Sequence, residues 1–415
     1  MTQAIVIGAG AAGLRAAVAL RKAGRQVLVL EARDRIGGRV YSVEDRELGA
    51  TLEMGAEFVH GDLGELKKSR LRLEEMDGRH LSIVDGTLRD VTKDLRGVLS
   101  QLAKATGAGT AQSWLSRSDL PPLGRELARY YIEGFFAAPA AFVGVSDIPN
   151  DQGMRTRRVL GGYDHALRPL ADSLREDSAL RLGTVVTEVM WRRGHVVVKA
   201  RTRTGRDLAP FQAEKLIVTL PVGVLLARPG QDGAVRFDPP LKRKREALGW
   251  LRMGGVVKAV LRFREPVWAA KPVRKADFVH APGAAFPTWW RTGSPDTPLV
   301  TGWAGGPAAS KLGKSDPLPA ALSSLARVLG RSASDLEGLL ESANIVDWAQ
   351  DPYSRGAYVY HLAEAPASTT ADLAAPEEDT LYFAGEATSL TERSGTVDGA
   401  MESGLRAAKE ALAKR

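Results

Sequence analysis

Six residues near the start of the chain have the types and spacing of a phosphate-binding loop. They are Gly8-Ala9-Gly10-Ala11-Ala12-Gly13, and Glu31 follows at the distance usual for that motif, about 20 residues on. In this pattern Gly8 allows a tight turn, Gly10 lets the backbone approach a pyrophosphate, and Gly13 lets a helix pack closely on a strand. Glu31 can accept hydrogen bonds from a ribose diol. The spacing predicts a dinucleotide site without separating NAD from FAD.

The elements around this loop must position it. The apolar run Ala4–Ile7 predicts a strand, residues 14–23 a helix that Gly24 ends, and Gln26–Leu30 a second strand. Strand, glycine turn, helix and strand form a βαβ unit, in which the positive end of the helix faces the phosphates.

The next segment contributes more groups of the same kind. Gly37 and Gly38 let the backbone pass close to a diphosphate or ring, and Arg33 and Arg39 can offset its charge. Residues 35–39 form an R-x-G-G-R segment, and here the sequence resembles the flavin-containing amine oxidase family. That wider group also holds protoporphyrinogen oxidases and carotenoid desaturases. The resemblance implies FAD as cofactor, held by Gly8, Gly10, Ala12, Gly13, Glu31, Ala32, Arg33, Gly37, Gly38 and Arg39.

Length and composition set broad limits. A chain of 415 residues favours two domains, and 44% hydrophobic with 26% charged residues is ordinary for a globular protein. The absence of cysteine excludes disulfides, thiolate metal sites and thioether attachment of a flavin. No apolar run approaches the ~18 residues of a membrane span, and the first strand leaves no room for a signal peptide. We therefore expect a cytoplasmic protein without a metal.

The positive charge does not by itself indicate a nucleic-acid partner. The formal net charge is +8, with basic runs at Lys242–Arg245 and Arg155–Arg158. Aromatic residues do not alternate with these runs and no nucleic-acid motif appears, so we interpret both as solvated faces. A basic protein does not attract a cationic substrate, so amine specificity would come from local carboxylates or from binding a neutral amine.

A second group of candidate residues lies in the segment Glu53-Met54-Gly55-Ala56-Glu57-Phe58-Val59-His60-Gly61. On residue type alone, a single loop histidine is more often structural than functional. In the amine oxidase family an E-x-G-A-x-x-x-H-G segment lies beside the isoalloxazine ring, and its form with His before Gly is most similar to polyamine and spermine oxidases. The resemblance implies that Met54, Gly55 and Ala56 contact the cofactor, and that Glu57 and His60 contact a substrate amine.

Residues 62 to about 150 carry leucines at helical spacing and predict a largely helical insertion over the substrate cavity. The cluster Tyr130, Tyr131, Phe135 and Phe136 could line that cavity, although an aromatic stripe on a helix is more often core.

Lys258 interrupts an apolar run, residues 253–263, that predicts one long strand. By spacing alone, an edge-strand lysine facing solvent is favoured. The family places a lysine at this point of the same strand, joined through a water to flavin N(5). The resemblance implies that Lys258 assists proton movement and the reaction of reduced flavin with dioxygen.

Residues 346–358 match another family motif: a tryptophan, an acidic-Pro-aromatic turn, a glycine, a variable residue and an aromatic. Here these include Trp348, Gly356, Ala357 and Tyr358. Monoamine oxidases have a cysteine that bonds FAD at the position of Ala357, so the resemblance implies noncovalent FAD. Tyr358 would form one wall of an aromatic substrate cage.

The remaining cofactor contacts are implied by two further matches. A strand over 184–189 is similar to one that meets the adenine, which suggests Val186. The C-terminal segment resembles the family's FAD-closing motif, with Gly385 and Glu386 ending a strand and Thr396-Val397 starting a helix. That helix would point N–H groups at the flavin N(1)/O(2) edge. Val397 stands where monoamine oxidases carry the second cage tyrosine, which favours a polyamine-oxidase-like pocket.

The resemblance implies an α/β fold in which a Rossmann-type FAD-binding domain (1–70, 152–236 and 355–415) is interleaved with an α+β substrate domain (71–151 and 237–354) built on a mixed sheet flanked by helices. It implies oxidation of a C–N bond in a primary or secondary amine, polyamine or monoamine. Hydride transfer to flavin would give an imine, then an aldehyde, and dioxygen would become hydrogen peroxide. The sequence leaves a homodimer open.

Three alternatives remain. An L-amino-acid oxidase needs a buried arginine for the substrate carboxylate, and Arg155, Arg157 and Arg291 are candidates. A desaturase or porphyrinogen oxidase would not be expected to keep both Lys258 and the 348–358 motif. A non-catalytic FAD-containing binding protein is the third, and the presence of Lys258 counts against it.

Overall fold

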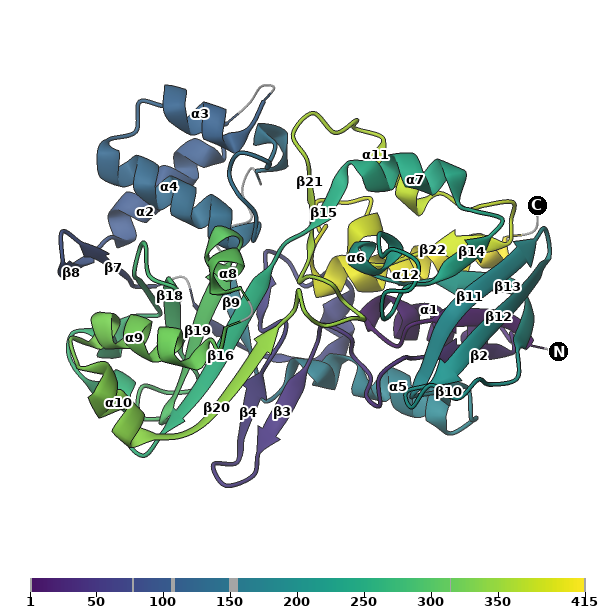
Figure 1. Cartoon of the computed structure of the whole chain (residues 1–415), viewed down its shortest axis with the longest axis horizontal. Coiled ribbons are helices and arrows are strands. Elements are labelled where there is room, and N and C mark those ends of the chain that lie inside the picture. Colours follow the sequence, from purple (N-terminus) through teal and green to yellow (C-terminus); the bar gives the residue numbers. More distant parts are fainter. Residues whose placement is uncertain (1, 77, 106–108, 149–155, 314, 414–415) are drawn as a thin grey trace.

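Two large sheets, one in each half of the molecule, organise the fold (Figure 1). The computed structural model describes residues 2–413 apart from 77, 106–108, 149–155 and 314. Within these residues no helix is both long enough and apolar enough to cross a bilayer.

The first sheet has eight strands in the order β10-β2-β1-β13-β12-β11-β14, with β22 also paired to β13. Its centre is parallel, and Ile5 and Val6 of β1 are fully buried, as expected for a strand covered on both faces. The strands are β1 (Thr2–Ile7), β2 (Val27–Leu30), β10 (Leu180–Arg181), β11 (Thr184–Arg192), β12 (His195–Thr202), β13 (Phe211–Val218), β14 (Arg236–Asp238) and β22 (Leu381–Phe383).

Helices α1 (Ala11–Lys22) and α12 (Val397–Leu412) pack together in the core of this half. They approach so closely that a Cβ on Gly404 would lie 2.2 Å from the carbonyl oxygen of Ala12. The first and last helices of the chain are therefore held side by side, beneath the glycine loop. The other helices of this half are α5 (Arg168–Arg175), α6 (Val222–Leu225), α7 (Lys242–Gly249) and α11 (Thr369–Ala374).

The second sheet has seven strands in the order β20-β16-β19-β18-β17-β7-β8. Neighbouring residues on its strand β18 point to opposite faces: Trp289 packs in a core with Leu322 and Leu325 of α9, whereas Trp290 lines a cavity. The strands are β7 (His80–Val84), β8 (Thr87–Asp90), β16 (Val256–Phe263), β17 (Phe278–His280), β18 (Thr288–Arg291), β19 (Leu299–Gly305) and β20 (Leu340–Asp347). The helices beside it are α8 (Pro307–Leu312), α9 (Leu318–Leu329) and α10 (Ala333–Leu339).

A helical group and three small sheets complete the molecule. Helices α2 (Thr92–Leu102), α3 (Ala111–Arg117) and α4 (Pro122–Phe135) share one core and sit above the seven-stranded sheet in Figure 1. The small sheets are β5 (Phe58–His60), β9 (Thr156–Leu160) and β6 (Arg72–Glu75); β3 (Ser42–Asp45) and β4 (Ala50–Glu53); and β15 (Leu251–Met253) and β21 (Val359–His361).

The prediction of a mainly helical segment over 62–150 is wrong in its first part. Residues 72–75, 80–84 and 87–90 form the strands β6, β7 and β8, and the hairpin of β7 and β8 turns at Asp85 and Gly86. Both turn residues have positive φ, 49° and 75°, as a two-residue hairpin loop requires. The Asp-Gly pair was the sequence signal for this hairpin.

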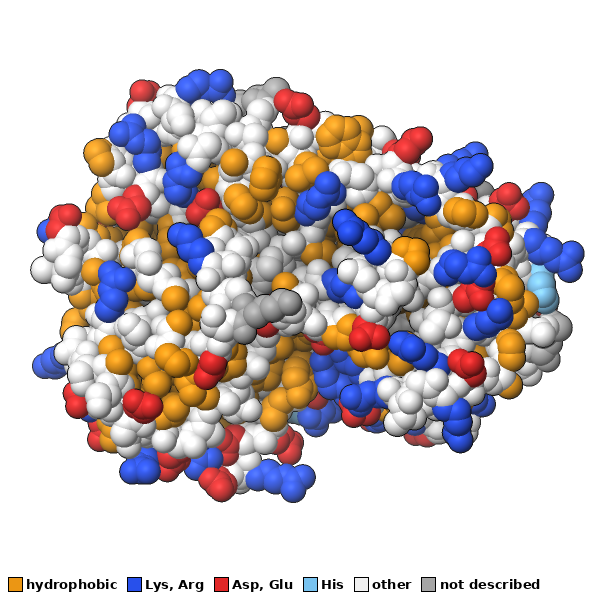
Figure 2. Space-filling view, in the orientation of Figure 1, with side chains coloured by type: hydrophobic (Ala, Val, Ile, Leu, Met, Phe, Trp, Pro, Cys, Tyr) orange, Lys and Arg blue, Asp and Glu red, His pale blue; other side chains and the backbone are white. Residues whose placement is uncertain are grey.

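Two further expectations also need correction. The strand predicted over 253–263 is broken at Gly254, where a Cβ would lie 2.7 Å from that of Ala137, and the chain changes sheets there from β15 to β16. The basic runs are not fully solvated, since Arg157, Arg158 and Lys244 are buried. The Nζ of Lys244 donates to the carbonyls of Asp372 and Ala375 at the C-terminal end of α11. Burial lowers the pKa of Lys244 to about 8. Elsewhere Lys and Arg are spread among Asp and Glu over the face in Figure 2.

We propose that each large sheet is the centre of one domain, with the boundaries predicted above. Strands of the eight-stranded sheet come from residues 2–30, 180–238 and 381–383, and those of the seven-stranded sheet from 80–90 and 256–347. The chain passes between the two repeatedly, which places segments far apart in sequence at their junction.

Candidate active site

A cavity of about 930 Å³ is lined by residues of both halves of the molecule. From the first half it takes the glycine loop after β1, the segment after β2 and the start of α12. From the second it takes Lys258 of β16, Trp290 of β18 and the aromatic residues of α4. One continuous space therefore joins the predicted dinucleotide site to the predicted substrate region.

The glycine loop has the geometry that a diphosphate requires. Gly8 has φ +105°, and a Cβ on Gly13 would lie 2.0 Å from the carbonyl oxygen of Gly8. At Gly10 an added Cβ would meet only the carbonyl oxygen of Gly37, at 3.8 Å, so the backbone is open toward the cavity. These residues and Ala12 fit the close approach of a dinucleotide.

Glu31 is buried and fixed by the backbone. Its Oε2 accepts the N–H of Ala9 at 2.7 Å, and its Oε1 accepts the N–H of Arg33 at 2.9 Å. Glu31, Ala32 and Arg33 all line the cavity, and so does Val186 of β11. The carboxylate is thus held at the end of β2, where a ribose diol can reach its remaining lone pairs.

The arginines near Gly37 and Gly38 have protein partners. Arg39 donates to Glu386 at 2.9 Å and to the carbonyl of Ala357 at 2.7 Å, while Arg33 pairs with Asp351. Arg35, for which we predicted no role, donates to the carbonyl of Gly38 at 2.9 Å and lies 3.8 Å from the ring centroid of Tyr41. All three charges fix the loop, and Arg33 and Arg39 also line the cavity.

The start of α12 lies at the cavity with its N–H groups available. Thr396 caps the helix, since its side chain accepts the N–H of Gly399 at 3.0 Å. Gly385, Glu386, Thr396 and Val397 line the cavity together. A partial positive charge at this end suits the anionic edge of a reduced flavin.

Lys258 is completely buried in the interior of the seven-stranded sheet, between β19 and β20. The expectation from spacing alone, a lysine on an edge strand facing solvent, is therefore wrong. Its Nζ donates to Glu57 Oε2 at 2.7 Å and to the carbonyl of Gly55 at 3.1 Å. The indole N–H of Trp290 donates to Glu57 Oε1 at 3.0 Å. The structure thus brings Glu57, Lys258, Gly55 and Trp290 into one cluster.

His60 lines the cavity at the end of β5. Its ring lies 5.6 Å from that of Phe135, and the hydroxyl of Thr156 is 3.4 Å from Nδ1. Burial lowers the pKa of His60 to about 4, so its imidazole is neutral at physiological pH.

The first and last aromatic residues of the 348–358 motif, Trp348 and Tyr358, occupy different places. The indole N–H of Trp348 donates to the carbonyl of Met54 at 3.1 Å, which joins this motif to the Glu53–Gly61 segment. The hydroxyl of Tyr358 donates to the carbonyl of Gly134 at 3.3 Å, and burial raises its pKa. Tyr358 and Ala357 line the cavity, as do Gly55 and Ala56, whereas Met54 is not among the lining residues described.

Several cavity residues were not predicted from the sequence. Trp303 of β19 lies opposite Lys258 in strand register and shares a packing cluster with Tyr358. The others come from strands β7, β17 and β18: His80, Phe278, His280, Thr288 and Trp290. The signal that could have found them is the alternation of side chains between the two faces of these short strands. Tyr130, Tyr131, Phe135 and Phe136 line the cavity as well, and Tyr131 and Phe136 also pack against the core that α2, α3 and α4 share.

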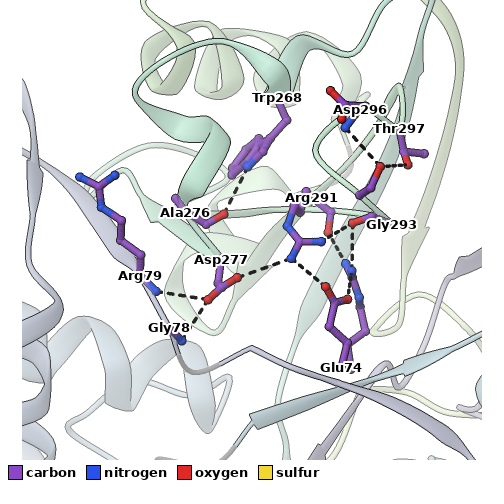
Figure 3. Close-up of polar contacts among 12 residues, drawn as sticks. Glu74, Gly78, Arg79, Trp268, Ala276, Asp277, Arg291, Gly293, Asp296 and Thr297 are labelled. Atoms are coloured by element: carbon purple, nitrogen blue, oxygen red, sulfur yellow. Dashed lines mark hydrogen bonds and ion pairs between the residues drawn. The ribbon is translucent and has the colours of Figure 1, made fainter.

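The described candidate arginines for an amino-acid oxidase do not line the cavity. Arg291 donates to Glu74 at 2.8 Å and lies 3.7 Å from Asp277, in the polar network of Figure 3. Arg157 donates to the carbonyl of Gly61. Neither is among the described residues that line the cavity, and Arg155 lies outside the described residues. Within the described part of the chain, no cluster of three or more His, Asp or Glu could hold a metal.

Comparison with known proteins defines the family. The family model of flavin-containing amine oxidoreductases matches residues 11–412, so the chain belongs to that family. It is 28% identical to polyamine oxidase 3 of Oryza sativa subsp. japonica, over 98% of this chain and 88% of the relative. It is also 28% identical to polyamine oxidase 2 of Arabidopsis thaliana, over 98% and 87%.

Solved structures agree in fold. Wild-type putrescine oxidase bound to putrescine superposes with a TM-score of 0.79 at 23% identity, covering 100% of this chain and 99% of that chain. The two-domain α/β fold and the family are thus confirmed. The protein is an oxidoreductase acting on amines, and its cofactor is a flavin.

Proposed function

We propose that the protein is an amine oxidase that oxidises the C–N bond of a primary or secondary amine, either a polyamine or a monoamine. The observation that most supports this is the single cavity lined both by the glycine loop and by aromatic rings around the buried Lys258. When bound, FAD supplies the hydride acceptor and, with dioxygen, yields hydrogen peroxide. The amine loses a hydride from its α-carbon and a proton from nitrogen, and the imine is hydrolysed to an aldehyde and a smaller amine.

The aromatic side chains select and desolvate the amine in this proposal. Tyr358 and Trp303 present ring surfaces that favour an amine and exclude water. His60 is neutral and can accept a hydrogen bond from the amine N–H. Binding the amine in its neutral form leaves the nitrogen lone pair available as the α-carbon gives up its hydride.

The remaining groups act on the cofactor side. The N-terminus of α12, with Thr396 as its cap, favours negative charge that develops on the flavin. Lys258 lines the cavity as a hydrogen-bond donor that can hold a water or assist proton movement. These assignments, with those of the nucleotide loop, are part of the proposal.

Anaerobic reduction of the FAD-loaded protein tests the proposal. We would follow the flavin band near 450 nm while adding spermine, spermidine, putrescine, a benzylic amine and several L-amino acids in turn, then admit air. Bleaching by an amine, with peroxide on reoxidation, is the expected result. Bleaching by amino acids alone would move the assignment to an L-amino-acid oxidase. A flavin that dithionite reduces and no amine bleaches would favour a non-catalytic binding protein.

A further inference from the structure

Glu57 is a buried carboxylate whose two oxygens already have partners within the protein. Oε2 accepts from Lys258 at 2.7 Å, and Oε1 accepts from the indole N–H of Trp290 at 3.0 Å. Glu57 is 4% exposed and Lys258 0% exposed. A substrate amine that bound Glu57 would compete with an ammonium held at short distance in a region without bulk water.

The two charges depend on each other. A buried ammonium is costly without a counter-charge, and so is a buried carboxylate without donors. The pair satisfies both, and the ring of Trp290 adds a π face 5.6 Å from Lys258 Nζ. Gly55 supplies the third contact through its carbonyl, so the ammonium is fixed from three directions.

We propose that Glu57 is a positioning residue that holds Lys258 charged and in place at the cavity wall, and that it does not bind the substrate amine. This inference rests on the proposed function, because it specifies how Lys258 is made ready to act beside the cofactor. The N–H of Trp290 orients the carboxylate. Substrate recognition is then left to the aromatic walls and to His60.

Among the described residues, Glu53 of β4 is a further titratable group near this pair. It is buried, the charges of Lys258 and Glu57 both act on it, and burial raises its pKa to about 7. A titration of the cluster must therefore separate Glu53 from Lys258. Comparing variants that keep Glu53 but differ at Lys258 does this.

The test uses the FAD-loaded protein without substrate. Wild type, E57Q, K258M and the double variant E57Q/K258M are titrated from pH 5.5 to 10 while the visible flavin spectrum is recorded. Removing the carboxylate leaves the buried ammonium without its counter-charge, which disfavours the charged form. We expect a spectral transition in E57Q that wild type, K258M and the double variant lack. W290F, which keeps both charges, should show no such transition.

Thermal unfolding gives a second readout, which can be measured even if E57Q is much less stable than wild type. We expect E57Q to lower the midpoint temperature and the double variant to recover at least half of that loss, because it removes the unpaired ammonium. If E57Q titrates like wild type and the double variant is no more stable than E57Q, the inference is overturned. If the transition appears in E57Q but no amine bleaches the wild-type flavin, the positioning role stands and the proposed function fails.

Discussion

Glu53 allows a stability test that depends on one buried carboxyl group. It is 5% exposed and accepts the N–H of Tyr163 at 2.7 Å and the hydroxyl of Ser42 at 2.8 Å. Burial is the largest influence and raises its pKa from 4.5 to about 7. Between these values the native protein binds more protons at Glu53 than the unfolded chain does, so its contribution to stability falls as pH rises from 4.5 to 7. At about 1.4 kcal/mol per pH unit the loss amounts to about 3 kcal/mol.

Replacing Glu53 with glutamine should remove this pH dependence, because an amide does not titrate in this range. The amide oxygen can still accept the Tyr163 N–H, so the hydrogen bond is kept. An unfolding entropy of about 2.1 cal/mol/K per residue gives roughly 0.9 kcal/mol/K for this chain, so 3 kcal/mol corresponds to about 3–4 °C. We would measure midpoint temperatures of FAD-loaded wild type and E53Q at pH 5 and 8.5. Starting at pH 5 leaves about 2 pH units of this span, so relative to E53Q wild type should lose about 3 °C between the two pH values. An identical pH dependence of the two proteins would refute the reasoning.

Three more predictions concern the cavity itself. Because His60 is neutral above about pH 4, H60Q should change the rate of anaerobic flavin reduction by the same factor at pH 5 and pH 8; an inflection that H60Q abolishes would contradict this. Gly55→Ala would place a Cβ 1.9 Å from a backbone oxygen, so FAD binding should weaken by about tenfold or more, whereas Gly97→Ala, in open space on α2, should retain the flavin absorbance. R39M leaves the buried Glu386 without its cation and should cost about 3 kcal/mol in thermal stability, part of which R39M/E386Q restores; no recovery in the double variant would show that the ion pair is not the cause.

The sequence predicted the nucleotide half of the fold well because its signals are local. Strand, glycine turn and helix follow one another within the first residues, and β1, α1 and β2 lie within a few residues of their predicted bounds. The helix start at Thr396 was implied by the resemblance to the family's FAD-closing motif, and the structure shows Thr396 capping that helix.

Prediction was weaker where burial depends on distant partners. Lys244 lies in a run of four charged residues, and its burial depends on distant partners: the carbonyls of Asp372 and Ala375, the carboxylate of Glu377 and the ring of Phe383. Trp289 and Trp290 look alike in sequence, and the packing of α9 on one face of β18 decides which of them lines the cavity. The break at Gly254 likewise follows from the nearness of Ala137 across the fold.

The site depends on both halves of the chain because hydrogen bonds join its motifs to one another. Met54, Gly55 and Glu57 accept hydrogen bonds from Trp348 and Lys258, so one short segment is fixed by β16 and by the turn that follows β20. A second link runs from Arg39 to Ala357 and Glu386, segments separated by more than 300 residues. Motifs that sequence analysis treats as independent matches are thus physically coupled, and a change in one should alter the geometry of the others. The double variants at 57/258 and 39/386 measure that coupling directly.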